Sequence, residues 1–139
     1  MNTLRVRTRL AREPDDGRDY LLPELLVDGH PLLDFQRRNL GLDLRQLAES
    51  TRRDGEFFIV TCACGDAACA GIRRGFTVRR DAKNVLWVVR GVGPTRTLAF
   101  GREPYLQAVE QGILELRRLK QRHACRIVPS TNDSLLEAS

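Results

Sequence analysis

Pro104-Tyr-Leu-Gln-Ala-Val-Glu-Gln-Gly-Ile-Leu-Glu-Leu-Arg-Arg-Leu-Lys-Gln-Arg122 is the longest stretch of this chain that keeps one pattern throughout. Apolar side chains recur every three or four residues along it, which is the period of an α-helix with one buried face. These side chains are Tyr105, Val109, Ile113 and Leu116. Proline suits the first turn of a helix, and basic residues near the end complement the helix dipole. We therefore predict a helix at about residues 104–122 that packs across one face of a sheet.

The chain before this helix is dominated by the patterns of β-strands. Residues 3–10 place apolar side chains on one face and arginines on the other, as in a half-buried antiparallel strand. Apolar runs on either side of Asp28-Gly29 predict a hairpin, because this dipeptide favours two-residue turns. Further strands are predicted at residues 57–60, at 75–79 and 84–90 as a second hairpin, and at 97–100.

A second helix is predicted at about residues 40–53, where leucines fall on one helical face and Asp43 can cap the start. Together these elements predict an α+β fold, with a mainly antiparallel sheet of about five to seven strands and two helices. With 139 residues the chain has the size of one domain, which we assign to residues 1–128. The small and polar residues 129–139 predict a flexible C-terminal tail.

Charge is unevenly distributed along the chain. Residues 1–70 carry 10 basic and 12 acidic side chains, whereas residues 71–126 carry 13 basic and 4 acidic ones, a net charge of +9. A surface of that sign attracts acidic proteins or nucleic acid, although charge is the only criterion for nucleic-acid binding that the sequence meets. The candidate contacts are Arg73, Arg74, Arg79, Arg80, Arg117, Arg118 and Arg122.

Three of the four cysteines lie in Thr61-Cys-Ala-Cys-Gly-Asp-Ala-Ala-Cys-Ala-Gly71, which we call the cysteine loop. If the preceding strand continues through Cys62 and Cys64, their side chains leave from one face, about 7 Å apart along the backbone. Gly65 and Asp66 then permit a turn that brings Cys69 back toward the pair. The loop therefore predicts three converging sulfur ligands, a set that suits zinc.

A structural zinc site needs a fourth ligand. His123 and Cys125, just beyond the long helix, are the main candidates, and His30 and Asp66 are weaker ones.

Two other interpretations of the cysteines stay open. Free cysteines often pack as small hydrophobes, and the alanines around these thiols favour that interpretation. A redox role, such as a disulfide between Cys64 and Cys69, would need a stabilised thiolate, for which Arg73 and Arg74 could supply the positive charge.

Glu56-Phe-Phe-Ile-Val-Thr-Cys-Ala-Cys-Gly-Asp-Ala-Ala-Cys-Ala-Gly-Ile72 resembles uncharacterised bacterial proteins that carry a Cys-x-Cys-Gly-x-x-x-Cys-x-Gly segment. The resemblance covers about residues 20–90 and implies no activity, because none is known for that group. Cys125 lies outside the shared segment. The matching positions are Cys62, Cys64, Gly65, Cys69 and Gly71.

No complete catalytic signature occurs in the sequence, so we favour a binding or interaction module over an enzyme. The alternatives are a small thiol-dependent redox or metal enzyme that uses the cysteine loop, and a nucleic-acid-binding protein. No apolar run approaches the roughly 20 residues that cross a bilayer, and residues 3–10 lack a signal-peptide core. The expected compartment is the cytoplasm, where thiols stay reduced.

Overall fold

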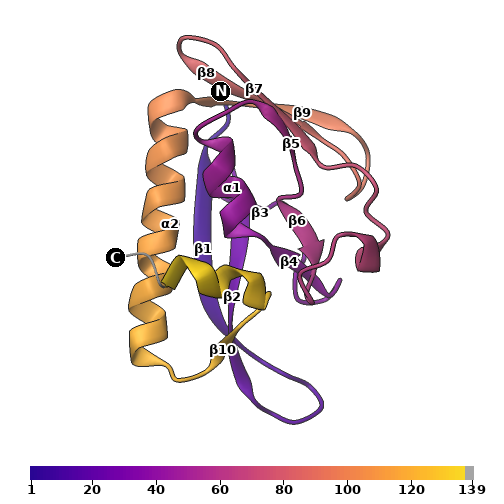
Figure 1. The fold of residues 1–139 in the computed structure, drawn as a ribbon, viewed down its shortest axis with the longest axis vertical. Helices are drawn as coiled ribbons and strands as arrows, with labels where there is room; N and C mark the ends of the chain where they lie inside the picture. The colour runs from indigo at the N-terminus through magenta and orange to yellow at the C-terminus, as the bar shows by residue number, and fades with distance from the viewer. Residues whose placement is uncertain (137–139) are drawn as a thin grey trace.

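A computed structural model describes residues 1–136, which form an α+β fold (Figure 1). Within these residues there are two α-helices, two short 3-10 helices and ten strands. The strands are arranged in three sheets, which differs from the single sheet of five to seven strands predicted from the sequence. The structure has more strands than predicted because several of them have only two or three residues, which is too short to produce a recognisable sequence pattern.

The first sheet is built on a long hairpin. Strand β1 (Leu4–Arg12) is the strand that the alternation predicted, and it pairs with β2 (Asp19–Val27) along its whole length. The outer edge of β2 receives β3 (His30–Pro31) in antiparallel pairing at one end and β10 (Arg126–Ile127) in parallel pairing at the other. In Figure 1 this hairpin runs down the molecule beside the long helix.

Helix α2 (Arg102–Arg122) confirms the predicted long helix, and it packs against β1. Gly112, in the middle of α2, lies directly on Val6 of β1. The carboxylate of Glu115 accepts a hydrogen bond from the Thr8 N–H at 2.7 Å. Neither α2 nor any other helix of residues 1–136 has both the length and the apolarity needed to span a membrane.

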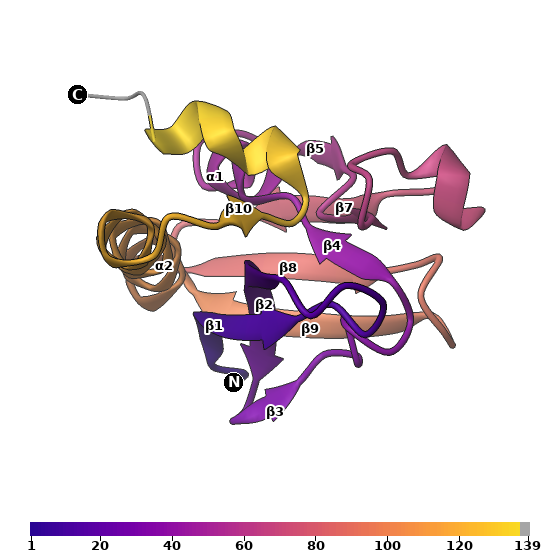
Figure 2. The same ribbon diagram turned by 90° about the horizontal axis from the view of Figure 1, so that it is seen from below.

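The third sheet has the order β5 (Gly55–Phe57), β7 (Phe76–Arg80), β8 (Asn84–Val89) and β9 (Arg96–Gly101). Figure 2 shows these strands extending away from α2. Trp87 of β8 is fully buried, and its ring centroid lies 5.0 Å from Phe100 and 5.9 Å from Tyr105 of α2. The first turns of α2 therefore join this sheet to the first one.

The second sheet consists of β4 (Leu40–Leu42) and β6 (Val60–Cys62) in antiparallel pairing. Helix α1 (Leu44–Ser50) follows β4, so the helix predicted at residues 40–53 is shorter, and its first part is a strand. Asp43 caps α1 as expected, with its carboxylate accepting from the Arg45 N–H at 3.0 Å. Leu40 fits the helical face predicted with Leu44 and Leu47, whereas the spacing of Leu40 and Leu42 is that of a strand, which forms by pairing with β6.

The chain after β10 differs from the flexible tail predicted at residues 129–139. Ser130–Leu136 form the 3-10 helix η2, which lies over α1 (Figure 2). Asn132 of this segment is fully buried. Its side chain is hydrogen-bonded to the backbone around β4 and α1. Residues 137–139 of the predicted tail lie outside the described part of the chain.

Candidate metal centre

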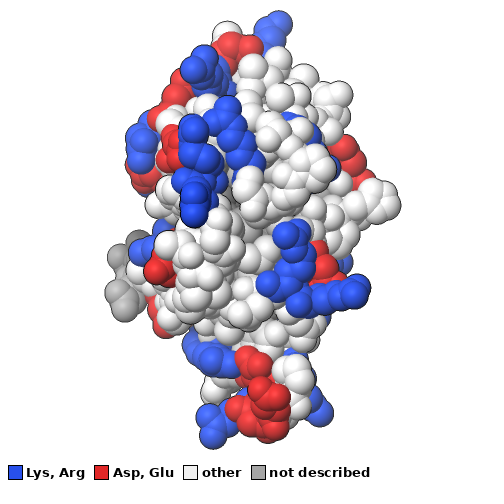
Figure 3. All heavy atoms as spheres, turned by 90° about the vertical axis from the view of Figure 1, so that its right-hand side faces the viewer, with Lys and Arg blue, Asp and Glu red and all other residues white. Residues whose placement is uncertain are grey.

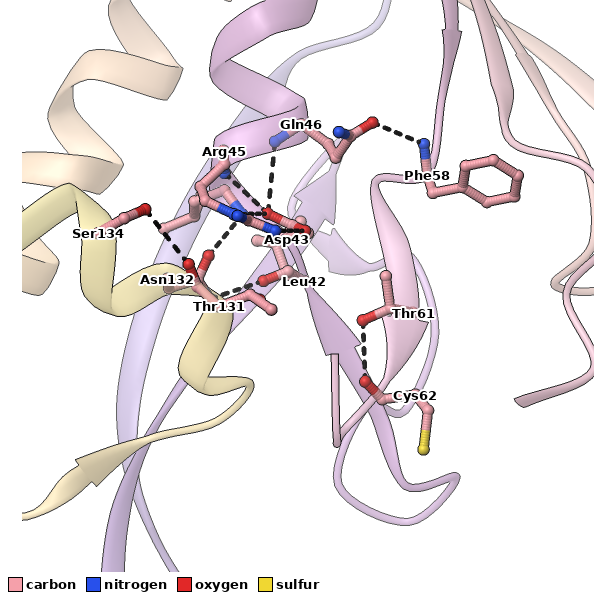
Figure 4. A network of polar contacts seen from close by, with 11 residues as sticks. Leu42, Asp43, Arg45, Gln46, Phe58, Thr61, Cys62, Thr131, Asn132 and Ser134 are labelled. Carbon is pink, nitrogen blue, oxygen red and sulfur yellow. Dashed lines mark hydrogen bonds and ion pairs between the residues drawn. The ribbon is translucent and has the colours of Figure 1, made fainter. Parts of the chain in front are cut away.

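Strand β6 positions the first cysteine of the loop. Leu40 of β4 and Cys62 of β6 are partners in register, and Cys62 is only 7% exposed. The hydroxyl of the buried Thr61 donates to the Cys62 carbonyl at 2.8 Å (Figure 4). The Sγ atom of Cys62 points away from Thr61 in this view. The first sulfur is therefore held by a paired strand.

A tight turn follows at once, so Cys64 lies outside the strand. The Gly65 N–H donates to the Cys62 carbonyl at 2.8 Å, and the Cys62 N–H donates to the Asp66 carbonyl at 3.3 Å. Gly65 has a φ of 96°, a conformation that side chains with a Cβ rarely adopt. This turn brings the second sulfur back over the end of β6.

A second turn positions the third cysteine. Asp66 Oδ1 accepts from the Ala68 N–H at 2.9 Å, directly ahead of the 3-10 helix η1 (Ala68–Ala70), in which Cys69 lies. Gly71 ends this helix in the left-handed conformation at φ 74°. The Ile72 N–H then donates to the Ala67 carbonyl at 3.0 Å and closes the loop.

The three sulfur atoms converge, as the sequence predicted. The Sγ atoms of Cys62, Cys64 and Cys69 all lie within 4.8 Å of one another, and all four cysteines of the chain are free thiols. Within residues 1–136 this is the only group of three or more His, Cys, Asp or Glu side chains with such spacing. Cys62 is buried, whereas Cys64 and Cys69 are exposed, so the cluster has one protected and one accessible side.

Hydrogen bonds inside the cluster make the three thiols unequal. The Cys64 backbone N–H bonds to the Cys62 sulfur and, with the neighbouring thiols, lowers the pKa of Cys62 despite its burial. The Cys69 thiol bonds to the sulfurs of Cys62 and Cys64, and its pKa is raised to about 11. A metal cation binds cysteines as thiolates, so binding to this group would displace the protons of the three thiols.

The chain after β10 supports the loop from behind. A Cβ on Gly65 would lie 2.7 Å from Thr131 Cγ2, and a Cβ on Gly41 would lie 2.6 Å from Pro129 Cδ, so both glycines are in close contact with this segment. Asn132 accepts from the Leu44 N–H at 2.8 Å and donates to the Leu42 carbonyl at 2.9 Å (Figure 4).

Sequence reasoning missed this support. The two glycines and the asparagine lie far apart in the sequence, and the composition of residues 129–139 resembles that of an exposed tail.

The residues predicted as a fourth ligand are not part of the cluster in the described chain. His123 follows α2, where its N–H donates to the Leu119 carbonyl at 2.9 Å. The Cys125 carbonyl accepts from the Lys120 ammonium, and Cys125 lines a separate cleft at the start of β10. His30 is exposed in β3.

Asp66, the remaining candidate, belongs to the loop, but its carboxylate does not join the group of three sulfurs. Its Oδ1 atom already accepts from the Ala68 N–H.

Three of the seven arginines predicted to bind a partner have bonds inside the protein. Arg74 pairs with Glu56 at 3.2 Å. Arg80 is paired with Asp54 and also donates to backbone carbonyls at the end of α1, among them Thr51 O at 2.8 Å. Arg117 donates to the Leu135 carbonyl at 2.8 Å.

Among the residues of the described chain, the other four arginines form no ion pair; they are Arg73, Arg79, Arg118 and Arg122. On the face drawn in Figure 3, basic side chains form separate groups with uncharged surface between them and acidic side chains beside several. That face therefore carries no continuous basic patch.

Comparison with known proteins adds no family to this description. No protein-family model matches the chain, and neither a curated protein nor a solved structure matches it. The resemblance of the cysteine loop to bacterial proteins with the same spacing therefore stays a prediction, and the function is argued from the geometry of the loop.

Proposed function

We propose that this protein is a small zinc-binding module in which Cys62, Cys64 and Cys69 hold one metal ion. The observation that carries the proposal is the convergence of the three sulfurs to within 4.8 Å of one another. Two sulfurs bound to one tetrahedral zinc lie about 3.8 Å apart when each Zn–S distance is about 2.3 Å. The cluster therefore needs a contraction of at most about 1 Å, which side-chain rotation supplies.

Zinc has a structural purpose in this loop. Residues 63–71 contain one short 3-10 helix and no strand, and five of their six backbone hydrogen bonds lie within residues 62–72. A metal ion would tie Cys64 and Cys69 to Cys62, which is fixed in β6. The loop would then be ordered by coordination, as in other small metal-stabilised segments.

The wider function that we propose is that of an interaction module in a reducing compartment such as the cytoplasm. Reduced thiols are needed for metal binding, and disulfides would compete with it in an oxidising compartment. Arg73, Arg79, Arg118 and Arg122 supply the charge for an acidic partner; Arg118 and Arg122 both belong to α2, Arg79 belongs to β7, and Arg73 lies in the segment before β7. The three other predicted arginines have partners inside the fold.

A thiol-based redox function is the second candidate, because the same three thiols are close together and two are exposed. A disulfide would require two sulfurs to approach to about 2.05 Å and would leave the third without a partner. All three thiols have an equivalent role around a metal ion, so the metal interpretation accounts for more of the geometry.

Metal content measured together with thiol titration separates the two functions. We expect the reduced, full-length protein to contain about one zinc per chain. We also expect Cys62→Ser, Cys64→Ser and Cys69→Ser to lose it, while Cys125→Ser retains it as the matched control. A chelator should lower the melting temperature of the wild type and leave that of Cys69→Ser unchanged.

A metal-free protein with four freely reacting thiols would refute the zinc proposal. One fast-reacting thiol in such a metal-free sample would favour the redox function instead.

A further inference from the structure

We propose that the outer face of the third sheet binds an extended acidic segment of a partner protein, in which one apolar side chain lies between two carboxylates. The inference rests on the interaction module proposed above and names its surface and the chemistry of its partner, without use of the metal. The surface is a groove of about 530 Å³ over β7, β8 and β9, which we call the β8 groove.

The floor of the β8 groove is apolar at its centre. Leu86 and Val88 are two residues apart in β8, so both side chains point to the outer face, whereas Trp87 between them is buried on the inner face. The solvated face of an antiparallel sheet usually carries polar residues. Leu86 is nevertheless 46% exposed, and Val88 beside it is only half-buried. Adjoining apolar side chains inside a groove are typical of interaction sites, unlike single exposed ones.

Polar groups border this apolar centre. Thr77 of β7 and Thr97 of β9 are the register partners of Val88 on the two neighbouring strands. Asn2 borders the groove beside β9, where its N–H donates to the Ala99 carbonyl at 2.7 Å and its Oδ1 accepts from the Ala99 N–H at 2.9 Å. The groove is therefore apolar in the middle and polar at its rim, as protein interfaces are.

Two arginines line opposite ends of the groove. Arg79 of β7 is the register partner of Leu86. Arg90 follows Val88 by two residues, just beyond the end of β8. Four residues of strand thus separate the two positions, which is about 13 Å at about 3.3 Å per residue. Neither arginine forms an ion pair within residues 1–136.

Glu56, an acidic side chain on the same face of the sheet, is already paired. It lies opposite Thr77 in register, on β5. Its carboxylate accepts from the Gly75 N–H at 3.1 Å and pairs with Arg74 at 3.2 Å. The positive charge of Arg79 and Arg90 therefore remains for a partner.

These spacings define the partner segment. In an extended chain, residues i and i+4 lie on one face about 13 Å apart, with residue i+2 between them. Asp or Glu at i and i+4 would match Arg79 and Arg90, and an apolar residue at i+2 would cover Leu86 and Val88. A second copy of this chain is a poorer occupant, because its own groove would bring arginine against arginine.

Binding of a designed peptide, followed by NMR spectroscopy, tests this inference. The probe is a capped, threonine-rich peptide with glutamate at positions i and i+4 and leucine at i+2. We expect saturable shifts of the backbone amide signals of Leu86, Val88 and Thr97. Arg79→Glu and Arg90→Glu should each weaken binding by about fivefold or more. Arg118→Glu, at an exposed position of α2, is the matched control and should bind as the wild type does.

Two altered peptides and one further variant test the chemistry of the groove. A peptide with lysine in place of both glutamates, and one with serine in place of leucine, should bind more weakly than the probe. Leu86→Ser should weaken binding of the probe as well. Equal binding of the lysine peptide would refute the acidic class of partner. Equal binding of the serine peptide would refute the apolar contact.

The remaining outcomes separate this inference from the others. No saturable shift at millimolar peptide concentration would overturn it. Self-association of the protein that Leu86→Ser abolishes would assign the groove to a second copy, also against the inference. Cys69→Ser should bind the peptide as the wild type does, so a failure of the zinc site and a failure of the groove are distinguishable.

Discussion

Thr131 Cγ2 occupies the space that a side chain on Gly65 would need, since a Cβ there would lie 2.7 Å away. Gly65 is the turn residue between Cys64 and Asp66, and its φ is 96°. The contact joins the cysteine loop to η2 directly. The geometry of the proposed metal site therefore depends on a segment that contributes no ligand to it.

The variant Gly65→Ala tests this contact. We expect it to lower the free energy of unfolding by roughly 2–4 kcal/mol, from the unfavourable φ and the overlap with Thr131 together. Gly71→Ala is the matched control, because Gly71 also has a positive φ but has open space around it. The control should cost about 1–2 kcal/mol. Chemical denaturation of both variants provides the comparison.

A double-mutant cycle isolates the steric part of this loss. Thr131→Ser removes Cγ2, so Gly65→Ala should cost less in the Thr131→Ser background than in the wild type. Equal costs in the two backgrounds would show that the packing contact carries no energy.

Asn132→Ala should be among the most damaging substitutions in the chain after β10. It leaves the Leu42 carbonyl and the Leu44 N–H without their bonds in a buried position, at a cost of roughly 2–4 kcal/mol in the free energy of unfolding. Asp133→Ala, at an exposed neighbouring position, should change this free energy by less than about 0.5 kcal/mol. A flexible tail in solution would instead give the same small effect for both variants in denaturant titrations.

Stability should fall at high pH through Tyr105. Its hydroxyl lies 2.6 Å from Ser50 Oγ and 3.1 Å from Trp87 Nε1, and burial raises the pKa of this phenol from 10.0 to about 12. Because the folded-state pKa is above the unfolded value, this contribution to stability is complete below about pH 10. It is lost as the pH rises through about 12.

Absorbance titration of tyrosinate in the wild type and in Tyr105→Phe measures this pKa. The late-titrating tyrosine should be missing in the variant, whereas Tyr20, whose pKa burial also raises, remains in both proteins. At neutral pH the same variant should be less stable by about 1–3 kcal/mol, because Trp87 and Ser50 each lose a hydrogen-bond partner. A single unshifted titration in the wild type would contradict the buried phenol.

The substitution Gly112→Ala has opposite effects on helix propensity and on packing. Alanine favours a helix over glycine by about 1 kcal/mol, so propensity alone predicts stabilisation. A Cβ at this position would overlap with Val6 of β1, and we expect a net loss of roughly 1–3 kcal/mol in the free energy of unfolding. Thermal denaturation of Gly112→Ala checks this. Combining it with Val6→Ala should recover little of the loss, because the Val6 Cβ, the nearest atom to the added methyl group, remains. An increase in melting temperature for Gly112→Ala alone would refute the close contact.

Local patterns accounted for the parts of the fold that local forces determine. The spacing of Tyr105, Val109 and Leu116 predicted α2, because apolar side chains that recur with the helical period over about five turns do not fit the pattern of a strand. The cysteine spacing predicted the convergence of three sulfurs, because two turns within the loop are sufficient to produce it. Both features depend on residues close together in the sequence.

The elements that were predicted incorrectly depend on distant partners. Leu40–Leu42 forms a strand only because β6 lies beside it. The chain after β10 is ordered because Asn132 finds unpaired backbone groups near β4 and α1. The sequence near these residues does not identify either partner. Leu40 also fits the helical face of Leu44 and Leu47, and residues 129–139 have the composition of an exposed tail.

The position of Asn132 in the sequence also has a consequence for biosynthesis. The ribosome makes the cysteine loop well before it makes Pro129, Thr131 and Asn132, so the nascent loop emerges without the segment that later packs behind it. During that interval three neighbouring thiols are free to react with oxidants or with the wrong metal. Loading of the proposed metal site would therefore depend on the timing of translation as well as on the chemistry of its ligands.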